Sequence, residues 1–172
     1  PEPIHCEGLD NSSILAMGSD LKNAFAMNKG SEILVGPHIG DLENISTHET
    51  LEWTIKRYKS LFSVQPDKII IDSHPQFFSS RLGERIGESF HLSVVPVQHH
   101  HAHIASVMAE HNLRGLVLGI AMDGTGYGPD GTIWGGEFLL CKGNQYQRLA
   151  HIHAAPLPGG EKAVSEPWRQ AL

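Results

Sequence analysis

Histidine is concentrated at one point of this sequence, where four histidines fall within five residues, at His99, His100, His101 and His103. On a helix, residues four apart share a face, so the imidazoles of His99 and His103 can both reach one metal ion. His100 and His103, three apart, can do so nearly as well, and spacing alone does not choose between the pairs. The competing interpretation is a polar helix cap with incidental histidines. Four histidines beside a buried strand favour metal binding.

Asp123 is the natural third ligand for such a metal. It ends an apolar strand and opens a glycine-rich loop, so we expect its carboxylate to project into a cleft. Two imidazoles and one carboxylate suit zinc, iron(II) or manganese, with positions left open for a substrate oxygen. A zincin peptidase is disfavoured, because position 100 is histidine rather than the glutamate of HExxH. The alternative for Asp123 is an ordinary turn aspartate, which is common before glycine.

The glycine-dense loop after Asp123 offers the unobstructed backbone N–H groups that a phosphate cradle requires. It is neither a Walker A sequence nor a strand-to-helix GxGxxG motif, and hairpins also use glycine for backbone reasons alone. A second pair of glycines allows either the close approach of a ligand or a β-bulge. The residues predicted to bind nucleotide in these two segments are Gly124, Thr125, Gly126, Tyr127, Gly135 and Gly136.

Lys22 lies at the turn of the first predicted meander of strands. In a two-lobe nucleotide fold that turn faces the cleft, so Lys22 is a candidate phosphate ligand, although an exposed hairpin lysine is the commoner explanation. Two further segments, 37–42 and 72–75, follow strands and carry polar groups toward the same sheet edge. Each either lines a substrate pocket or caps the next helix.

The elements that must position these residues follow from hydrophobic periodicity. A 3.6-residue spacing predicts helices over 47–62, 77–87 and 99–111, the first with Ser46 or Thr47 as N-cap. Short apolar runs predict strands over 14–18, 23–27, 32–36, 68–72, 92–97, 116–122, 132–140 and 146–153. The order is therefore three strands, then alternating helices and strands, then a second group of strands.

This order predicts an α/β fold of the actin/Hsp70/sugar-kinase (ASKHA) type, with two lobes that each begin with a three-strand meander. We expect a lead-in or linker over 1–13, a complete first lobe over 14–113 and a truncated second lobe over 114–172. The chain starts at Pro1 and stops in a segment, Trp168 to Leu172, that reads like the start of a helix. These ends predict a fragment of a longer protein.

The composition excludes several classes. A formal charge of −6 argues against a nucleic-acid-binding surface, which needs clustered lysine and arginine. No run of about 18 apolar residues is present, so no membrane span is expected, and no signal segment opens the chain. The two cysteines, Cys6 and Cys141, form no metal-type pair and predict free thiols in the cytoplasm.

The sequence resembles the HypF carbamoyltransferases, maturation factors of nickel–iron hydrogenases. The resemblance runs from about residue 14 to the end, and its matching segments are specific when they are taken together. The matching segments are Gly18 with Lys22–Asn23, Pro37–Asn44, Asp72–Pro75, Val97–Ser106, Met122–Gly128, Trp134–Phe138, Leu157–Gly160 and Glu166–Arg169.

The resemblance implies the first part of a C-terminal domain similar to the tRNA threonylcarbamoyl transferase TsaD. It implies that carbamoyl phosphate and ATP give carbamoyl adenylate, whose carbamoyl group passes to a C-terminal cysteine of the partner HypE. The family's metal histidines fall on His99 and His103, Asp123 matches the next ligand, and the loop after Asp123 matches the nucleotide-contacting loop. Lys22 matches a lysine expected near the phosphates. A further aspartate is expected beyond Leu172, so the fragment alone is expected to be inactive.

Three alternatives stay open at this point. A TsaD-type enzyme shares the fold but usually lacks the Asp-Gly-Thr-Gly-Tyr-Gly sequence of residues 123–128. A sugar kinase or ATPase holds its metal chiefly through carboxylates and phosphates, so the histidines disfavour it. A non-catalytic scaffold would use the histidines for structural zinc, which requires four protein ligands.

Overall fold

The computed structural model describes residues 3–6, 9 and 12–170, and its larger sheet has six strands. Strands β2, β3 and β4 form an antiparallel meander, whereas β2, β5 and β6 run parallel. In order across the sheet, the strands are β1 (Ile4–His5), β4 (Glu32–Val35), β3 (Ala26–Lys29), β2 (Ile14–Ala16), β5 (Lys68–Asp72) and β6 (Ser93–Val97).

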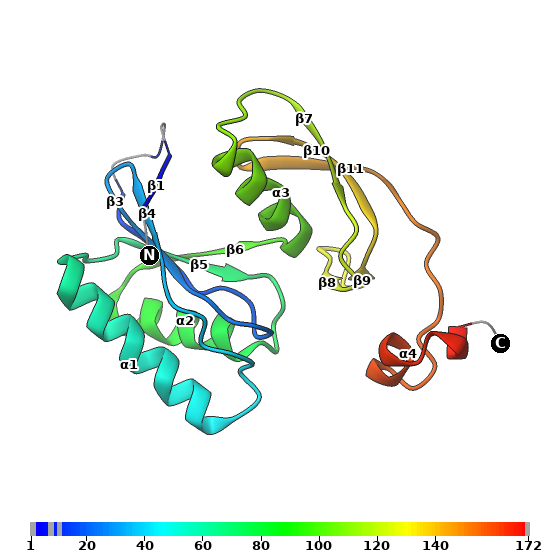
Figure 1. The fold of residues 1–172 in the computed structure, drawn as a ribbon, viewed down its shortest axis with the longest axis horizontal. Helices are drawn as coiled ribbons and strands as arrows, with labels where there is room; N and C mark the ends of the chain where they lie inside the picture. Colours follow the sequence, from blue (N-terminus) through cyan, green and yellow to red (C-terminus); the bar gives the residue numbers. More distant parts are fainter. Residues whose placement is uncertain (1–2, 7–8, 10–11, 171–172) are drawn as a thin grey trace.

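Three helices flank this sheet. Figure 1 shows α1 (Ile45–Phe62) and α2 (Phe78–Phe90) on one side of it and α3 (His99–Glu110) on the other. Along β5 the burial alternates, with Ile69 and Ile71 buried in the main hydrophobic core. Because successive strand residues point to opposite faces, this alternation fixes which face packs on the helices.

Helix α2 approaches the sheet closely because it carries glycine at its contact point. A Cβ atom at Gly83 would lie 2.5 Å from Cγ2 of Ile71 and 3.0 Å from Cγ of Met17. Any side chain there would push the helix away from β5. The same packing holds the carboxyl end of β5 in place, and Asp72 lies at that end.

A second sheet holds the other half of the site. It has three antiparallel strands in the order β11 (Gln145–His151), β10 (Glu137–Lys142) and β7 (Val117–Ala121). Helix α3 packs on β7, and a Cβ atom at Gly119 would lie 2.3 Å from Cδ1 of Ile104. The loop after β7 leads into a small antiparallel hairpin of β8 (Gly126–Tyr127) and β9 (Ile133–Trp134). Two short helical segments, α4 (Glu161–Ser165) and η1 (Pro167–Gln170), lie apart from both sheets in Figure 1.

The α/β class and most predicted elements are confirmed, and the strand over 68–72 matches its predicted bounds. Helices α1 and α2 are longer than predicted, and α1 begins after Asn44, which caps it without a side-chain bond, rather than after Ser46 or Thr47. Residues 4–5, placed in a lead-in, form β1 and pair with β4. Strand β3 begins at Ala26 rather than residue 23, because the buried amide of Asn23 binds the carbonyls of Met17 and Ser19.

The predicted strand over 132–140 was wrong as a single element. It is divided into β9 and β10 by Gly135 and Gly136. Gly136 has a positive φ of 66°. A Cβ atom at Gly135 would lie 2.5 Å from the carbonyl oxygen of Gly124, so the two loops touch through their backbones. Within the described residues, every helix is too short or too polar to cross a membrane.

Replacing Gly83 with alanine tests the close approach of α2. Gly→Ala inside a helix usually stabilises a protein, but here the added methyl group overlaps Ile71. We expect a loss of about 1–3 kcal/mol in the free energy of unfolding, measured by denaturant titration. The control is Glu84→Ala on the exposed face of the same helix, expected to change stability little. A Gly83→Ala chain more stable than wild type would contradict the packing.

Candidate metal and nucleotide site

Three side chains with metal-binding atoms converge where α3 meets the loop after β7. His99 and His103 lie one turn apart on α3, and their Nε2 atoms are 3.1 Å apart. Oδ2 of Asp123 lies 2.9 Å from Nε2 of His99 and 3.6 Å from Nε2 of His103. The donor atoms all lie within 4.8 Å of one another. One metal ion can therefore be shared by all three with only small side-chain adjustments.

Asp72 lies directly beside this cluster at the end of β5. One of its oxygens is 2.8 Å from Nδ1 of His99, and the other accepts a hydrogen bond from the backbone N–H of His74. A carboxylate at Nδ1 favours the proton on that nitrogen and leaves Nε2 to face a metal. The parallel pairing of β5 and β6 creates the contact, since Asp72 is in register with Val97, two residues before His99.

The carboxylates around His99 raise its pKa above the ordinary value. The hydrogen bond that His99 donates to Asp72 is the largest cause, burial of the ring opposes it, and the charges of Asp72 and Asp123 add to the increase. The surroundings of this ring therefore favour a positive charge. A divalent cation at Nε2 supplies that charge in place of a proton, so the cluster is suited electrostatically to a metal.

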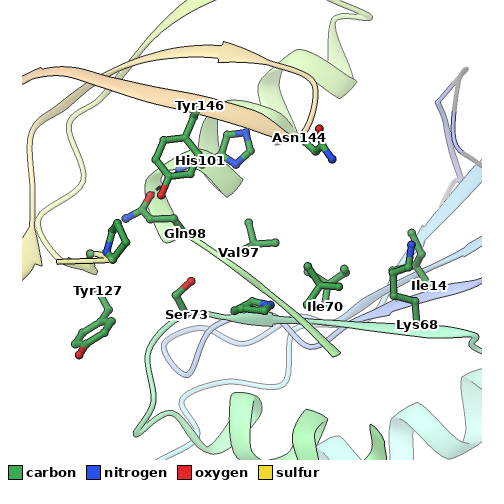
Figure 2. A pocket seen from close by; sticks show the side chains of 14 residues that line it. Ile14, Lys68, Ile70, Ser73, Val97, Gln98, His101, Tyr127, Asn144 and Tyr146 are labelled. Carbon is green, nitrogen blue, oxygen red and sulfur yellow. Dashed lines mark hydrogen bonds between the residues drawn. The ribbon is translucent and has the colours of Figure 1, made fainter. Parts of the chain in front are cut away.

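The other two histidines of the tract face elsewhere. His100 is fully buried, and its Nδ1 lies 3.1 Å from the side-chain nitrogen of Gln98, the N-cap of α3. His101 packs against the ring of Tyr146, and its Nε2 lies 3.3 Å from the carbonyl oxygen of Gly143. Burial lowers the pKa of both histidines. Figure 2 shows His101 and Tyr146 at a separate cavity of ≈730 Å³.

The structure thus distinguishes the pair His99 and His103 from the pair His100 and His103, which helical spacing alone did not. His99 and His103 share the face of α3 that meets Asp123, whereas His100 does not belong to the group of metal-binding side chains found among the described residues. The predicted ligand set His99, His103 and Asp123 is brought together in space. That the three hold a metal stays a prediction.

Three cavities adjoin this cluster, and the predicted glycine segments are divided between two of them. One, of ≈370 Å³, is lined by His99 and Asp72; the other, of ≈680 Å³, is lined by Asp123. The predicted nucleotide residues at the first are Thr125, Gly126 and Tyr127, and those at the second are Gly124, Gly135 and Gly136. A ligand in either cavity would lie beside a candidate metal ligand.

Lys22 is not among the residues that line either cavity. Its side chain is exposed, its backbone has a positive φ of 48°, and its N–H donates to Oδ1 of Asp41. Asp20, two residues earlier, turns toward α2 and accepts hydrogen bonds from the N–H groups of Phe78 and Ser79. The geometry brings the histidines and Asp123 together but not Lys22, whose contact with phosphate stays a prediction.

The contact of Asp72 with His99 and the pairing of Glu137 with Arg148 were not predicted from the sequence. Asp72 was predicted only to line a pocket or to cap a helix, although the sequence places it at the end of the strand that precedes the histidine-bearing strand and helix. Glu137 is fully buried, and its oxygens lie 2.6 Å from Nε and 2.7 Å from Nη2 of Arg148. The available signal was a pair of opposite charges within two neighbouring strand segments.

Comparisons with known proteins identify the family. Residues 9–110 match the HypF Kae1-like domain, and residues 119–172 match the second subdomain of the carbamoyltransferase Kae1-like domain. The chain belongs to the HypF carbamoyltransferase family. It is 43% identical over 159 residues to carbamoyltransferase HypF2 of Cupriavidus necator, covering 92% of this chain and 20% of that protein. It is 43% identical over 173 residues to HypF of Synechocystis, covering all of this chain and 22% of that protein.

Solved HypF structures agree with this assignment. A crystal structure of full-length HypF in a phosphate- and nucleotide-bound form superposes with a TM-score of 0.88 at 46% identity, over 95% of this chain and 25% of that one. HypF of T. kodakarensis superposes with a TM-score of 0.86 at 38% identity, over 95% of this chain and 21% of that one. The chain therefore spans about a fifth to a quarter of these HypF proteins.

The contact between Asp72 and His99 yields a prediction for metal affinity. Asp72→Asn keeps the shape of the side chain but removes the charge that orients the ring, so we expect divalent metal to bind about 10–100-fold more weakly. Calorimetric titration with Zn²⁺ or Mn²⁺ measures this. Asp67→Asn, near the opposite end of β5, is the matched control, because the Asp67 carboxylate accepts a hydrogen bond from the backbone N–H of Ser13, away from the cluster. Equal affinities in wild type and Asp72→Asn would remove Asp72 from the site.

Proposed function

We propose that this chain provides the metal- and nucleotide-binding part of a HypF-type carbamoyl transfer. The observation that carries the proposal is the cluster of His99, His103 and Asp123 between two cavities that carry the predicted glycine segments. The family assignment supports it, since the matched relatives are carbamoyltransferases. The full-length HypF structure with bound phosphate and nucleotide supports a nucleotide ligand, which we propose to be ATP.

The donor set fits a divalent metal of the zinc, iron(II) or manganese group, because it combines two imidazoles with one carboxylate. Such an ion supplies Lewis-acid chemistry, polarising a phosphate or carbamoyl oxygen. His99 and His103 present Nε2 to it, Asp72 keeps the His99 ring oriented, and Asp123 provides the negative ligand. The exposed side chain of His103 leaves one side of the cluster open to solvent and therefore to a substrate.

We propose that the nucleotide lies along the glycine segments on either side of Asp123. Their N–H groups suit phosphate oxygens, since a glycine backbone allows close approach. In this scheme carbamoyl phosphate, water and ATP yield carbamoyl adenylate, phosphate and pyrophosphate, and the carbamoyl group then passes to a thiolate with release of AMP. The two lobes of an ASKHA fold supply the cleft, consistent with the similar antiparallel orders β4-β3-β2 and β11-β10-β7 in the two sheets.

The acceptor thiol is proposed to come from a partner, the C-terminal cysteine of HypE. Of the two cysteines in this chain, Cys141 is buried in the core beneath the second sheet, where burial raises its pKa. Cys6 lies beside the other sheet, where its N–H binds the carbonyl of Ser31 next to β4. Neither thiol lies at the cluster of His99, His103 and Asp123. Hydrogenase maturation in the cytoplasm is the corresponding proposed setting.

Removing the imidazoles tests this function in full-length HypF. We expect His99→Ala and His103→Ala each to abolish stoichiometric metal binding, weaken ATP binding and reduce carbamoyl transfer by at least 100-fold, because both nitrogens meet at one ion. Metal content, ATP titration and a HypE carbamoylation assay provide the measurements. His111→Ala, an exposed histidine at the end of the same helix, is the control. Full metal content and activity in both variants would refute the assignment.

A further inference from the structure

Arg148 lines the cavity that contains Asp123 and at first suggests an anion-binding residue. Its hydrogen bonds argue otherwise. The guanidinium donates from Nε and Nη2 to Glu137, at 2.6 and 2.7 Å, and Nη1 lies 3.8 Å from Oδ2 of Asp130. Its flat face lies over the ring of Trp134, with Cζ 4.0 Å from the ring centroid. The positive charge of Arg148 is therefore paired with Glu137, and one face of its guanidinium is covered by Trp134.

Glu137 explains why Arg148 is held there. Its side chain is fully buried at the start of β10, so a charge at that position requires a partner. Besides Arg148, its Oε1 accepts a hydrogen bond of 3.1 Å from the N–H of Gly135. The buried carboxylate thus connects the Arg148 side chain to the backbone of the glycine turn.

The turn at Gly135–Gly136 also holds the loop that carries Asp123. The N–H of Gly136 donates to the carbonyl oxygen of Asp123 at 3.2 Å. Gly135 packs so closely on Gly124 that a Cβ atom would come within 2.5 Å of its carbonyl oxygen. Any shift of Gly135 is therefore transmitted to the backbone of residues 123–124.

Asp130 holds the other side of this series of contacts, next to Arg148 and Trp134. It accepts hydrogen bonds from the indole N–H of Trp134 and from the hydroxyl and N–H of Thr132. Those bonds lower the pKa of Asp130 to about 2, so it is ionised at neutral pH. Gly128 lies against Trp134, whose Nε1 would be 2.1 Å from an added Cβ atom. The β8–β9 hairpin is thereby joined to the side chains of β10 and β11.

We propose that Glu137 and Arg148, with Trp134 and Asp130, form a positioning unit that fixes the Gly135–Gly136 turn and the Asp123–Gly124 loop as one rigid wall of the site. Arg148 is a positioning residue and not a phosphate ligand. The unit places both the Asp123 carboxylate and the glycine N–H groups, so it governs metal and nucleotide affinity together. This inference rests on the proposed function for what the wall binds, but the rigidity of the wall stands independently.

The experiment compares wild type with Glu137→Gln and with Trp134→Phe, using backbone amide hydrogen exchange measured by NMR on the chain without ligands. Glu137→Gln keeps the side-chain volume but removes the charge that holds Arg148. Trp134→Phe removes the indole N–H that binds Asp130 and leaves a smaller ring under Arg148 and Gly128. We expect exchange at Gly124, Gly135 and Gly136 to accelerate by at least tenfold in Glu137→Gln and less in Trp134→Phe. The amide of Leu139 in β10 should keep its wild-type rate, which distinguishes local loosening from unfolding.

Zn²⁺ and ATP titrations of the same proteins complete the test. We expect both affinities to fall by about tenfold or more in Glu137→Gln, whereas a direct metal ligand variant, Asp123→Asn, should lose metal without faster exchange at Gly135. Glu52→Gln, which breaks the exposed pair with Arg85, is the matched control and should change neither quantity.

The outcomes separate the two proposals. Unchanged exchange at Gly124 and Gly135 in Glu137→Gln overturns the positioning unit, whatever the chain binds. Exchange that accelerates together with the loss of both affinities supports it. Accelerated exchange in a chain whose wild type binds neither Zn²⁺ nor ATP still supports the rigid wall, and the same absence of binding in full-length HypF refutes the proposed function. If Arg148→Lys retains the exchange pattern but loses ATP binding alone, Arg148 is a ligand and the inference is wrong.

Discussion

The site depends on one imidazole held between two carboxylates. Asp72 lies 2.8 Å from Nδ1 of His99, and Asp123 lies 2.9 Å from its Nε2. Asp72 ends β5 of the first sheet, whereas Asp123 lies in the loop after β7 of the second. Two negative charges on one half-buried ring require a positive charge between them. The raised pKa of His99 is one expression of that requirement, and the divalent cation proposed for this site would meet it in the same way. The contact also ties β5 of the first sheet to the loop after β7 of the second.

Close packing makes that contact possible. Gly83 allows α2 to lie against β5, and Gly119 allows α3 to lie against β7, since added Cβ atoms at these positions would overlap Ile71 and Ile104. Helix α3 therefore lies between the end of the six-stranded sheet and the three-stranded sheet, as Figure 1 shows. Because packed interiors are nearly incompressible, a small residue at each contact sets the distance across which the two aspartates approach His99.

The sequence predicted the parts of this arrangement that are local. The i, i+4 spacing of His99 and His103, and an aspartate at the end of an apolar strand, need only helix and strand periodicity. Asp72 was underrated because its role depends on the register between β5 and β6, which no local pattern contains. The opposite charges of Glu137 and Arg148 were readable, but their pairing was not, since it crosses β10 and β11 beside a register shift at Phe138–Leu139.

The exposure of the ligands bears on the competing functions. A structural zinc site is enclosed by its protein ligands, whereas the side chains of His103 and Asp123 are 56% and 41% exposed. Sugar kinases and ATPases of this architecture hold their metal through carboxylates and phosphates, so a pair of imidazoles departs from their chemistry. A partly open, mixed nitrogen and oxygen site instead suits an oxygen ligand that enters from solvent and leaves again. For the proposed metal, this geometry therefore favours substrate exchange over structural support.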